Sequence, residues 1–247
     1  MPLPRFHVDQ PLRPASRLPL PEAIAHHALR VLRMRAGDGL VLFDGSGGEY
    51  AATLEIQGRN GYTLLGAHDP REAELPGRIT LAQAIPASDK MDWVVEKAVE
   101  VGVHAVQPIA AARSVLRLAG DRLDKRVQHW RRVAVAACEQ SGRNRVPEVA
   151  APITLEQWLA AAQAEGAARL LCDPDAGSRL TDWIAAQTPP PVDIALLVGP
   201  EGGWAPEEIA LAIRHGVQPV RFGKRVLRTE TAGTALIAAI SAKLDWI

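Results

Sequence analysis

In the first 70 or so residues, the hydrophobic positions predict one short helix followed by several short strands. Residues 21–38 carry apolar side chains at helical spacing. Three β-rich runs follow, at residues 40–45, 49–56 and 61–67. A glycine-rich turn separates the first two runs, and Asn60-Gly61 before the third is a strong signal for a tight hairpin. The pattern predicts a small, mostly antiparallel β domain of barrel-like form.

From Arg78 onward, strand-like and helix-like runs alternate, which is typical of an α/β domain with a mostly parallel sheet. The expected strands are residues 79–84, 103–109, 169–173, 193–198 and 217–222. Residues 68–77 mix charges with proline and glycine and resemble a linker. We therefore expect two domains, at residues 1–72 and 73–247.

Three helices of the second domain carry most of its apolar pattern. The first covers residues 89–101, with Asp89 placed to cap it and Gly102 to end it. The second has one apolar side, formed by Leu123, Val127, Trp130, Ala134 and Ala137. The last, residues 230–247, is apolar nearly all round, so we expect it to be buried in the domain or at a subunit interface.

Composition excludes several classes of protein. The chain has 247 residues, 28 basic and 28 acidic side chains, and no apolar run as long as a membrane span. Cys138 and Cys172 are too few for a disulfide framework or a zinc cluster, which favours a reducing, cytoplasmic location. His26 and His27 are adjacent and point apart in a helix, so we expect no metal site.

Charge is concentrated locally despite the neutral total. Residues 113–145 hold nine basic and three acidic side chains, a net charge of +6 (9 − 3), and residues 1–35 hold six and two, a net charge of +4 (6 − 2). The nine basic residues are Arg113, Arg117, Arg122, Lys125, Arg126, Arg131, Arg132, Arg143 and Arg145. Such clusters are the expected footprint of a protein that binds a phosphate backbone, although a solvated basic helix face has the same composition.

Candidate ligand-binding loops lie where predicted strands end in glycine or proline. The stretch LLVGPEGGWAPEE, residues 196–208, leaves a strand at Gly199, and FGKRVLRTETAG, residues 222–233, leaves another at Gly223. A third strand end, LLCDPDAGS, is interrupted at Pro174. Ligands of open α/β sheets bind beyond the carboxyl ends of the strands, so the three loops are expected to wall one pocket. Alternatively, they are turns without a ligand. Neither nucleotide fingerprint, GxGxxG or the Walker P-loop, is present.

Four stretches together resemble one known family. They are GPEGGW, GKRVLRTETA, EQSGRNRVP at residues 139–147 and DKMDWVVEKAVEVGV at residues 89–103. They are similar to the RsmE family, bacterial 16S ribosomal RNA (uracil-N3)-methyltransferases of the SPOUT class, and HHALRVLRMRAGD resembles the family's PUA-like RNA-binding barrel. Two departures concern the substrate side: relatives often carry KGDRMD where residues 87–92 read ASDKMD, and TERS where residues 111–114 read AARS.

The resemblance implies a C-terminal SPOUT-type domain with a trefoil knot that binds S-adenosylmethionine, after a small N-terminal PUA-like β-barrel. The residues it places around the cofactor are Leu171, Cys172, Val198, Gly199, Glu201, Gly202, Phe222, Gly223, Val226 and Leu227. Apolar side chains and backbone amides of this kind suit an adenine ring. Cys172 is equally explained as a small buried hydrophobic residue.

The implied reaction transfers a methyl group to N3 of a specific uridine in 16S ribosomal RNA. Because that nitrogen carries a proton, a base or a charge-stabilising group is needed. Glu201 and Glu230 are the candidate bases, although Glu201 is also suited to accept backbone hydrogen bonds and Glu230 to begin a helix. Arg113, Arg143 and Arg228 are candidates for stabilising charge on the uracil carbonyls.

The implied partners are 16S ribosomal RNA in the small ribosomal subunit and a second copy of the chain. Two other functions remain open on the sequence. One is a SPOUT methyltransferase that acts on transfer RNA or on a ribose 2′-hydroxyl. The other is a non-catalytic RNA-binding protein of ribosome assembly, because a fold does not determine a function.

Overall fold

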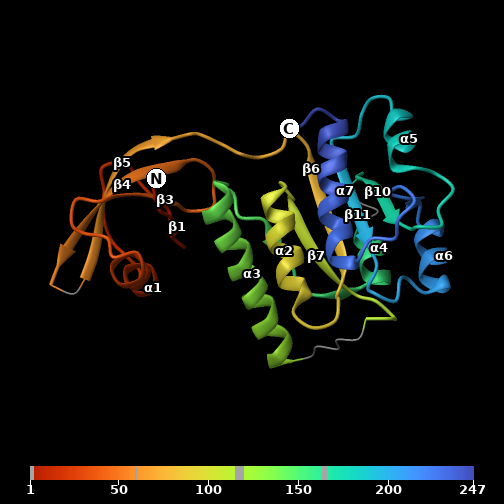
Figure 1. Ribbon diagram of the computed structural model, residues 1–247, viewed down its shortest axis with the longest axis horizontal. Coiled ribbons are helices and arrows are strands. Elements are labelled where there is room, and N and C mark those ends of the chain that lie inside the picture. Colours follow the sequence, from red (N-terminus) through yellow and green to blue (C-terminus); the bar gives the residue numbers. More distant parts are fainter. Residues whose placement is uncertain (1–2, 59, 115–119, 163–165) are drawn as a thin grey trace. The chain divides into compact units, whose positions relative to one another are not determined.

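The computed structural model describes residues 3–58, 60–114, 120–162 and 166–247 (Figure 1). Its contacts divide the chain into two compact units. The first unit is Met1–Glu74 together with Cys138–Val146, and the second is Leu75–Ala137 together with Pro147–Ile247. The sequence division at residues 72 and 73 did not anticipate the short second segment of the first unit.

A five-stranded sheet forms the first unit. Its strands are β1 (Arg5–His7), β2 (Arg17–Pro19), β3 (Gly39–Phe43), β4 (Glu49–Gln57) and β5 (Asn60–Asp69), in the order β1-β3-β4-β5-β2. Only the β1–β3 pair is parallel, and Gln57 pairs with Asn60 across the predicted hairpin. Alternate residues of β4, such as Ala52 and Leu54, are buried, as a sheet with one solvated face requires. The predicted antiparallel character is therefore confirmed.

The predicted helix at residues 21–38 is shorter and less regular than its pattern indicated. It comprises α1 (Glu22–His26) and a π-helical turn, η1 (His27–Val31), in which the Leu32 N–H donates to the His27 carbonyl. Arg33 then has φ of +55°, which ends the turn. Val31 and Leu32 are exposed, so only part of the expected apolar side is buried.

A seven-stranded sheet, in which all neighbouring strands are parallel, forms the centre of the second unit. The strands are β6 (Arg78–Ala84), β7 (Ala105–Ala110), β8 (Glu148–Val149), β9 (Ile153–Thr154), β10 (Ala168–Cys172), β11 (Asp193–Val198) and β12 (Gln218–Val220). Their order is β12-β10-β11-β6-β7-β8, with β9 also paired to β7. The five strands expected in this domain are all present, whereas β8 and β9 have two residues each and were not predicted.

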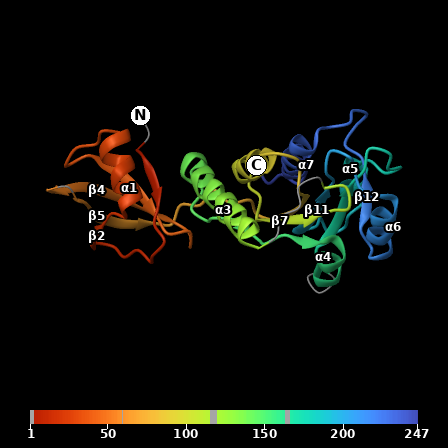
Figure 2. The ribbon, with the colours of Figure 1, turned by 90° about the horizontal axis from the view of Figure 1, so that it is seen from below.

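Helices cover both faces of this sheet. They are α2 (Lys90–Glu100), α3 (Asp121–Ser141), α4 (Leu155–Ala162), α5 (Leu180–Ala185), α6 (Pro206–Arg214) and α7 (Thr229–Lys243). Helices α2 and α7 pack against each other on one face, and α4 lies on the other (Figure 2). The apolar side predicted for α3 is buried at Val127, Trp130, Ala134 and Ala137. None of these helices, within the described residues, has the length and apolar character that a bilayer crossing requires.

The ends of α2 confirm one sequence prediction and correct another. Gly102 has φ of +91°, a left-handed conformation that ends the helix as expected. Asp89 precedes the helix but makes no side-chain cap hydrogen bond. Its carboxylate accepts instead from the Arg126 guanidinium, 2.9 Å away on α3, so a long-range ion pair replaces the predicted local cap.

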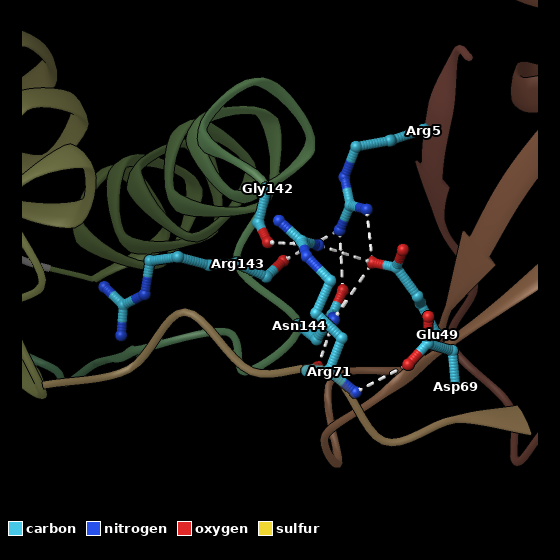
Figure 3. Close-up of polar contacts among 7 residues, drawn as sticks. All are labelled: Arg5, Glu49, Asp69, Arg71, Gly142, Arg143 and Asn144. Atoms are coloured by element: carbon cyan, nitrogen blue, oxygen red, sulfur yellow. Dashed lines mark hydrogen bonds and ion pairs between the residues drawn. The ribbon is translucent and has the colours of Figure 1, made fainter. Parts of the chain in front are cut away.

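A partly buried polar network holds the segment Cys138–Val146 within the first unit (Figure 3). The Asn144 side chain is fully buried, accepts from Arg5 Nη2 at 2.6 Å, and donates to Glu49 Oε2 at 3.1 Å and to the Arg71 carbonyl at 2.9 Å. Arg5 and Arg71 also pair with Glu49, at 2.5 and 2.9 Å. These contacts connect the end of α3 to β1 and β4 across more than 90 residues of sequence.

Candidate functional site

A cavity of about 530 Å³ lies at the carboxyl ends of the parallel strands in the second unit. Its wall includes Cys172 from the end of β10, Val198 from the end of β11 and Phe222 just after β12. Parallel strands end at the same edge of a sheet, and β12, β10 and β11 are neighbours in it. The three glycine- or proline-bearing loops expected from the sequence therefore meet at one cavity.

The loop after β11 is shaped by close packing. A Cβ atom at Gly199 would lie 3.2 Å from the Trp204 ring, so a larger residue fits only if the indole shifts. Gly203 has φ of +66°, which suits glycine. The absence of a side chain at Gly199 therefore makes room for Trp204 of the same loop.

Buried hydrogen bonds join this loop to the start of α7. The Thr229 hydroxyl donates to the Gly199 carbonyl at 2.5 Å and accepts from Gln83 Nε2 at 2.9 Å. Gln83 is fully buried and Thr229 nearly so. Gly199 and Thr229 line the cavity, and Gln83 at the end of β6 supports them from behind.

Hydrogen bonds to the Glu208 carboxylate join two loops of the second unit. Its carboxylate accepts from the Ala205 N–H at 2.8 Å, at the start of α6, and from the Ala112 N–H at 2.9 Å, after β7. The adjacent Arg113 donates to the Gly202 carbonyl at 2.8 Å. The loop that carries Arg113 is thereby attached to the loop after β11.

Two acids and a lysine face the same cavity. Lys90, the first residue of α2, lies 2.9 Å from Glu201 Oε1 and 3.5 Å from Glu230 Oε2. Burial opposes ionisation of Glu201, but hydrogen bonds from Lys90 and from the Ala87 N–H hold the pKa of its carboxyl below the ordinary value. The hydrogen bond to Glu201 raises the pKa of Lys90. Glu201 is therefore a carboxylate at neutral pH.

Two protein-family models match the chain. One, described as an RNA methyltransferase domain, matches residues 73–241, and the other, an RNA methyltransferase PUA domain, matches residues 20–64. Ribosomal RNA small subunit methyltransferase E of Synechocystis sp. is 37% identical over 92% of this chain and 73% of its own length. The protein of that name from Mycobacterium bovis is 38% identical over 87% of this chain and 82% of its own. The chain belongs to the RsmE family.

A solved RsmE structure has the same fold. The crystal structure of ribosomal RNA small subunit methyltransferase E from Neisseria gonorrhoeae, bound to S-adenosyl methionine, aligns with a TM-score of 0.88 and 36% identity over 97% of each chain. The predicted fold class, a SPOUT-type α/β domain with a smaller N-terminal PUA-like domain, is thereby confirmed.

The predicted catalytic candidates of this RsmE chain divide into two groups. Arg113, Glu201, Arg228 and Glu230 all line the cavity. Arg143 is not among the lining residues. It belongs to the first unit, where its guanidinium is buried and bound to the Glu74 carboxylate. With 3% of its surface exposed, Arg143 is a buried ion-pair partner, and its role in stabilising charge on uracil stays a prediction.

Some of the predicted cofactor residues line the cavity and others do not. Cys172, Val198, Gly199, Glu201, Phe222 and Leu227 line the cavity. Gly202 and Gly223 flank lining residues without lining it themselves. Leu171 is buried in the core of the sheet, and the Val226 side chain is 78% exposed. Alternation along β10 accounts for Leu171, because neighbouring residues of a strand point to opposite faces.

The Cys172 thiol is part of the cavity wall. Burial raises its pKa to about 11, helped by the neighbouring Asp173 carboxylate. The sulfur is therefore a neutral thiol at physiological pH, which suits an apolar wall better than a nucleophile. In the described parts of the chain, no group of three or more His, Cys, Asp and Glu side chains is arranged to hold a metal ion.

Several residues of the site were missed from the sequence. Lys90, Trp204, Arg225 and Thr229 line the cavity, and Gln83 lies behind Thr229. Lys90 and Gln83 could have been predicted as site residues, since both lie near the carboxyl end of the predicted strand at residues 79–84. That strand end reaches the same edge of the sheet as the three glycine- or proline-bearing loops.

Proposed function

We propose that the protein methylates N3 of a specific uridine in 16S ribosomal RNA of the small ribosomal subunit, with S-adenosylmethionine as methyl donor. The observation that carries the proposal is the convergence of three loops and two acids on one cavity at the strand ends of an RsmE-family chain. The RsmE protein of Neisseria gonorrhoeae, which shares this fold, binds that donor.

The residues of the cavity fit the donor. Its volume of about 530 Å³ lies within the ordinary range for small-molecule sites. Val198, Phe222 and Leu227 supply apolar walls for an adenine ring. Trp204 Nε1 is buried and, among the described residues, lacks a hydrogen-bond partner, so it is available to a polar group of the ligand.

S-adenosylmethionine, when bound, supplies a methyl group on a sulfonium sulfur. The protein must then orient the uracil, take its N3 proton and stabilise the charge that develops on the two carbonyl oxygens. Glu201 and Glu230 are the available carboxylates, and Arg113 and Arg228 are the guanidinium groups that line the cavity. A guanidinium presents several donors in one plane, which suits a uracil carbonyl or a phosphate.

The RNA-binding surface is proposed to include one side of α3. Arg122, Lys125 and Arg132 are exposed there at spacings of three and seven residues, so they share a side of the helix. Arg113, Arg126, Arg131 and Arg145 are engaged by groups of their own unit, and Arg117 lies outside the described residues.

We also propose that the protein acts as a homodimer in the cytoplasm. The Trp93 side chain on α2 is 42% exposed, and the neighbouring α7 presents half-buried small residues, Ala235, Ala238 and Ala239. Tryptophan is enriched at protein interfaces, so an exposed tryptophan on this helix pair supports the proposal. Sedimentation velocity with Trp93→Ala tests this: a shift to monomer is expected, and an unchanged dimer would contradict the use of this surface.

The proposed activity is tested on small subunits from a strain that lacks this methylation. Purified protein and S-adenosylmethionine are added, and the RNA nucleosides are identified by mass spectrometry. Appearance of 3-methyluridine at one site is expected. A 2′-O-methylated product, or methylation of transfer RNA instead, would assign the protein to another SPOUT activity. Binding of RNA without any donor affinity would indicate a non-catalytic assembly protein.

A further inference from the structure

The two acids of the cavity differ in how completely they are engaged. Glu201 accepts from Lys90 at 2.9 Å, and the Ala87 N–H reaches its two oxygens at 3.1 and 3.2 Å. Glu230 is the less exposed acid, with 16% of its side chain accessible against 34% for Glu201. Its Oε2 atom is buried and has no hydrogen-bond partner among the described residues. Lys90 Nζ lies 3.5 Å from the same atom, so Glu230 makes an ion pair where Glu201 accepts hydrogen bonds.

Lys90 lies between these acids and is bound unequally to them. Its contact with Glu230, at 3.5 Å, is an ion pair at the limit of hydrogen-bond length, whereas its contact with Glu201 is a normal charge-assisted hydrogen bond. Because Glu201 balances the charge of Lys90, Glu230 lies beside a nearly neutral Lys90–Glu201 ion pair. It does not lie beside an unpaired carboxylate. Without the lysine, two like charges would share one site, which favours protonation of one of them.

We propose that Lys90 is a positioning residue that gives the two acids different roles: it holds Glu201 as its counter-ion and leaves Glu230 as the acid that accepts the uracil N3 proton. This inference rests on the proposed function. In the step, Glu230 takes the N3 proton, N3 forms the bond to the methyl carbon, and the electron pair of the broken carbon–sulfur bond stays on sulfur. The lowered pKa of Glu201 agrees with a carboxylate that stays ionised.

Other charged groups face this cavity and contribute to its field. They are Arg113, Asp173, Asp175, Arg225 and Arg228. Arg228 pairs with the proposed proton acceptor, 4.0 Å from Glu230 Oε1, and its side chain is 83% exposed. Solvent screens so exposed a charge, so Lys90 is the main cation acting on the two acids.

The test is the pH dependence of kcat for methylation of small subunits in five variants, one of which is Glu201→Gln alone. For Lys90→Met, the acid limb should move upward by about one to two pH units, with activity recovering at alkaline pH. Lys90→Arg should keep the wild-type profile, because the cation is retained. The double variant Lys90→Met with Glu201→Gln should return the limb toward wild type, since removing the second carboxylate removes the repulsion. Glu230→Gln should lower kcat by about 10²- to 10⁴-fold at all pH values.

Each remaining result overturns the inference. A Lys90→Met profile that is scaled down without a shift would make the lysine merely structural. Loss of donor binding in that variant, measured by titration calorimetry, would make it a cofactor contact. A Glu201→Gln loss as large as that of Glu230→Gln would reverse the two acids. If the wild-type protein forms no 3-methyluridine, the proposed function itself fails, and that result is obtained before any variant is made.

Discussion

Replacing Asn144 by alanine tests whether the polar network of Figure 3 holds the segment Cys138–Val146 in the first unit. The change removes two hydrogen bonds to charged groups, Arg5 and Glu49, and one to the Arg71 carbonyl. Bonds to charged groups contribute about 1.5–3 kcal/mol each and neutral ones about 1 kcal/mol. Arg5 and Glu49 still pair with each other, so the contributions do not add fully, and we expect a loss of about 3 kcal/mol.

The aromatic residues separate the two units in an unfolding experiment. Both tyrosines, Tyr50 and Tyr62, lie in the first unit, whereas all six tryptophans lie in the second. In urea, Asn144→Ala should shift the tyrosine transition, followed by near-ultraviolet circular dichroism, more than the tryptophan fluorescence transition. Asn144→Asp is the matched control: it keeps an acceptor for Arg5 but places a carboxylate beside Glu49, 3.1 Å from the present amide nitrogen.

The aspartate variant should therefore destabilise the first unit at least as much as the alanine variant, although it is nearly isosteric. A cost below about 1 kcal/mol for both variants would refute the reasoning, because that is the range of a solvent-exposed hydrogen bond. A shift confined to the tryptophan transition would equally show that the network does not stabilise the first unit.

Three further predictions follow from the described contacts. Arg143→Ala should destabilise the first unit by about 3–5 kcal/mol in urea, because it leaves the Glu74 carboxylate without its buried partner, while donor binding persists. Arg145→Ala, at a neighbouring exposed arginine, is the control. Equal losses of stability in the two variants would contradict a structural role specific to Arg143. Ser88→Gly should raise stability by about 0.5–1 kcal/mol, since Ser88 has φ of +59°; a loss would mean that its side chain makes a needed contact. Because the pKa of Cys172 is about 11, the rate of its labelling by iodoacetamide should rise about tenfold per pH unit from pH 8 to 10. Bound donor should block the labelling. Fast labelling at pH 7 would count against a buried thiol.

Local patterns were sufficient for most of the secondary structure. The apolar side of α3, the alternation along β4 and the left-handed Gly102 all follow from stereochemistry within a few residues, so the sequence predicts them. The meeting of the three loops also followed from sequence, because carboxyl ends of neighbouring parallel strands share an edge. Strands of two residues, such as β8 and β9, leave no pattern to detect.

The partners of charged side chains were decided by the tertiary structure. Arg143 and Arg113 look alike in the sequence, yet one is bound to Glu74, 69 residues away, and the other lines the cavity. Asp89 was read as a local cap and instead binds Arg126, and Lys90 meets Glu201 across 111 residues of chain. The spacing of apolar residues predicts which side of a helix or strand is buried, because this spacing is set by residues within the same element. Which charge meets which depends on how distant elements pack, and no local pattern carries that information.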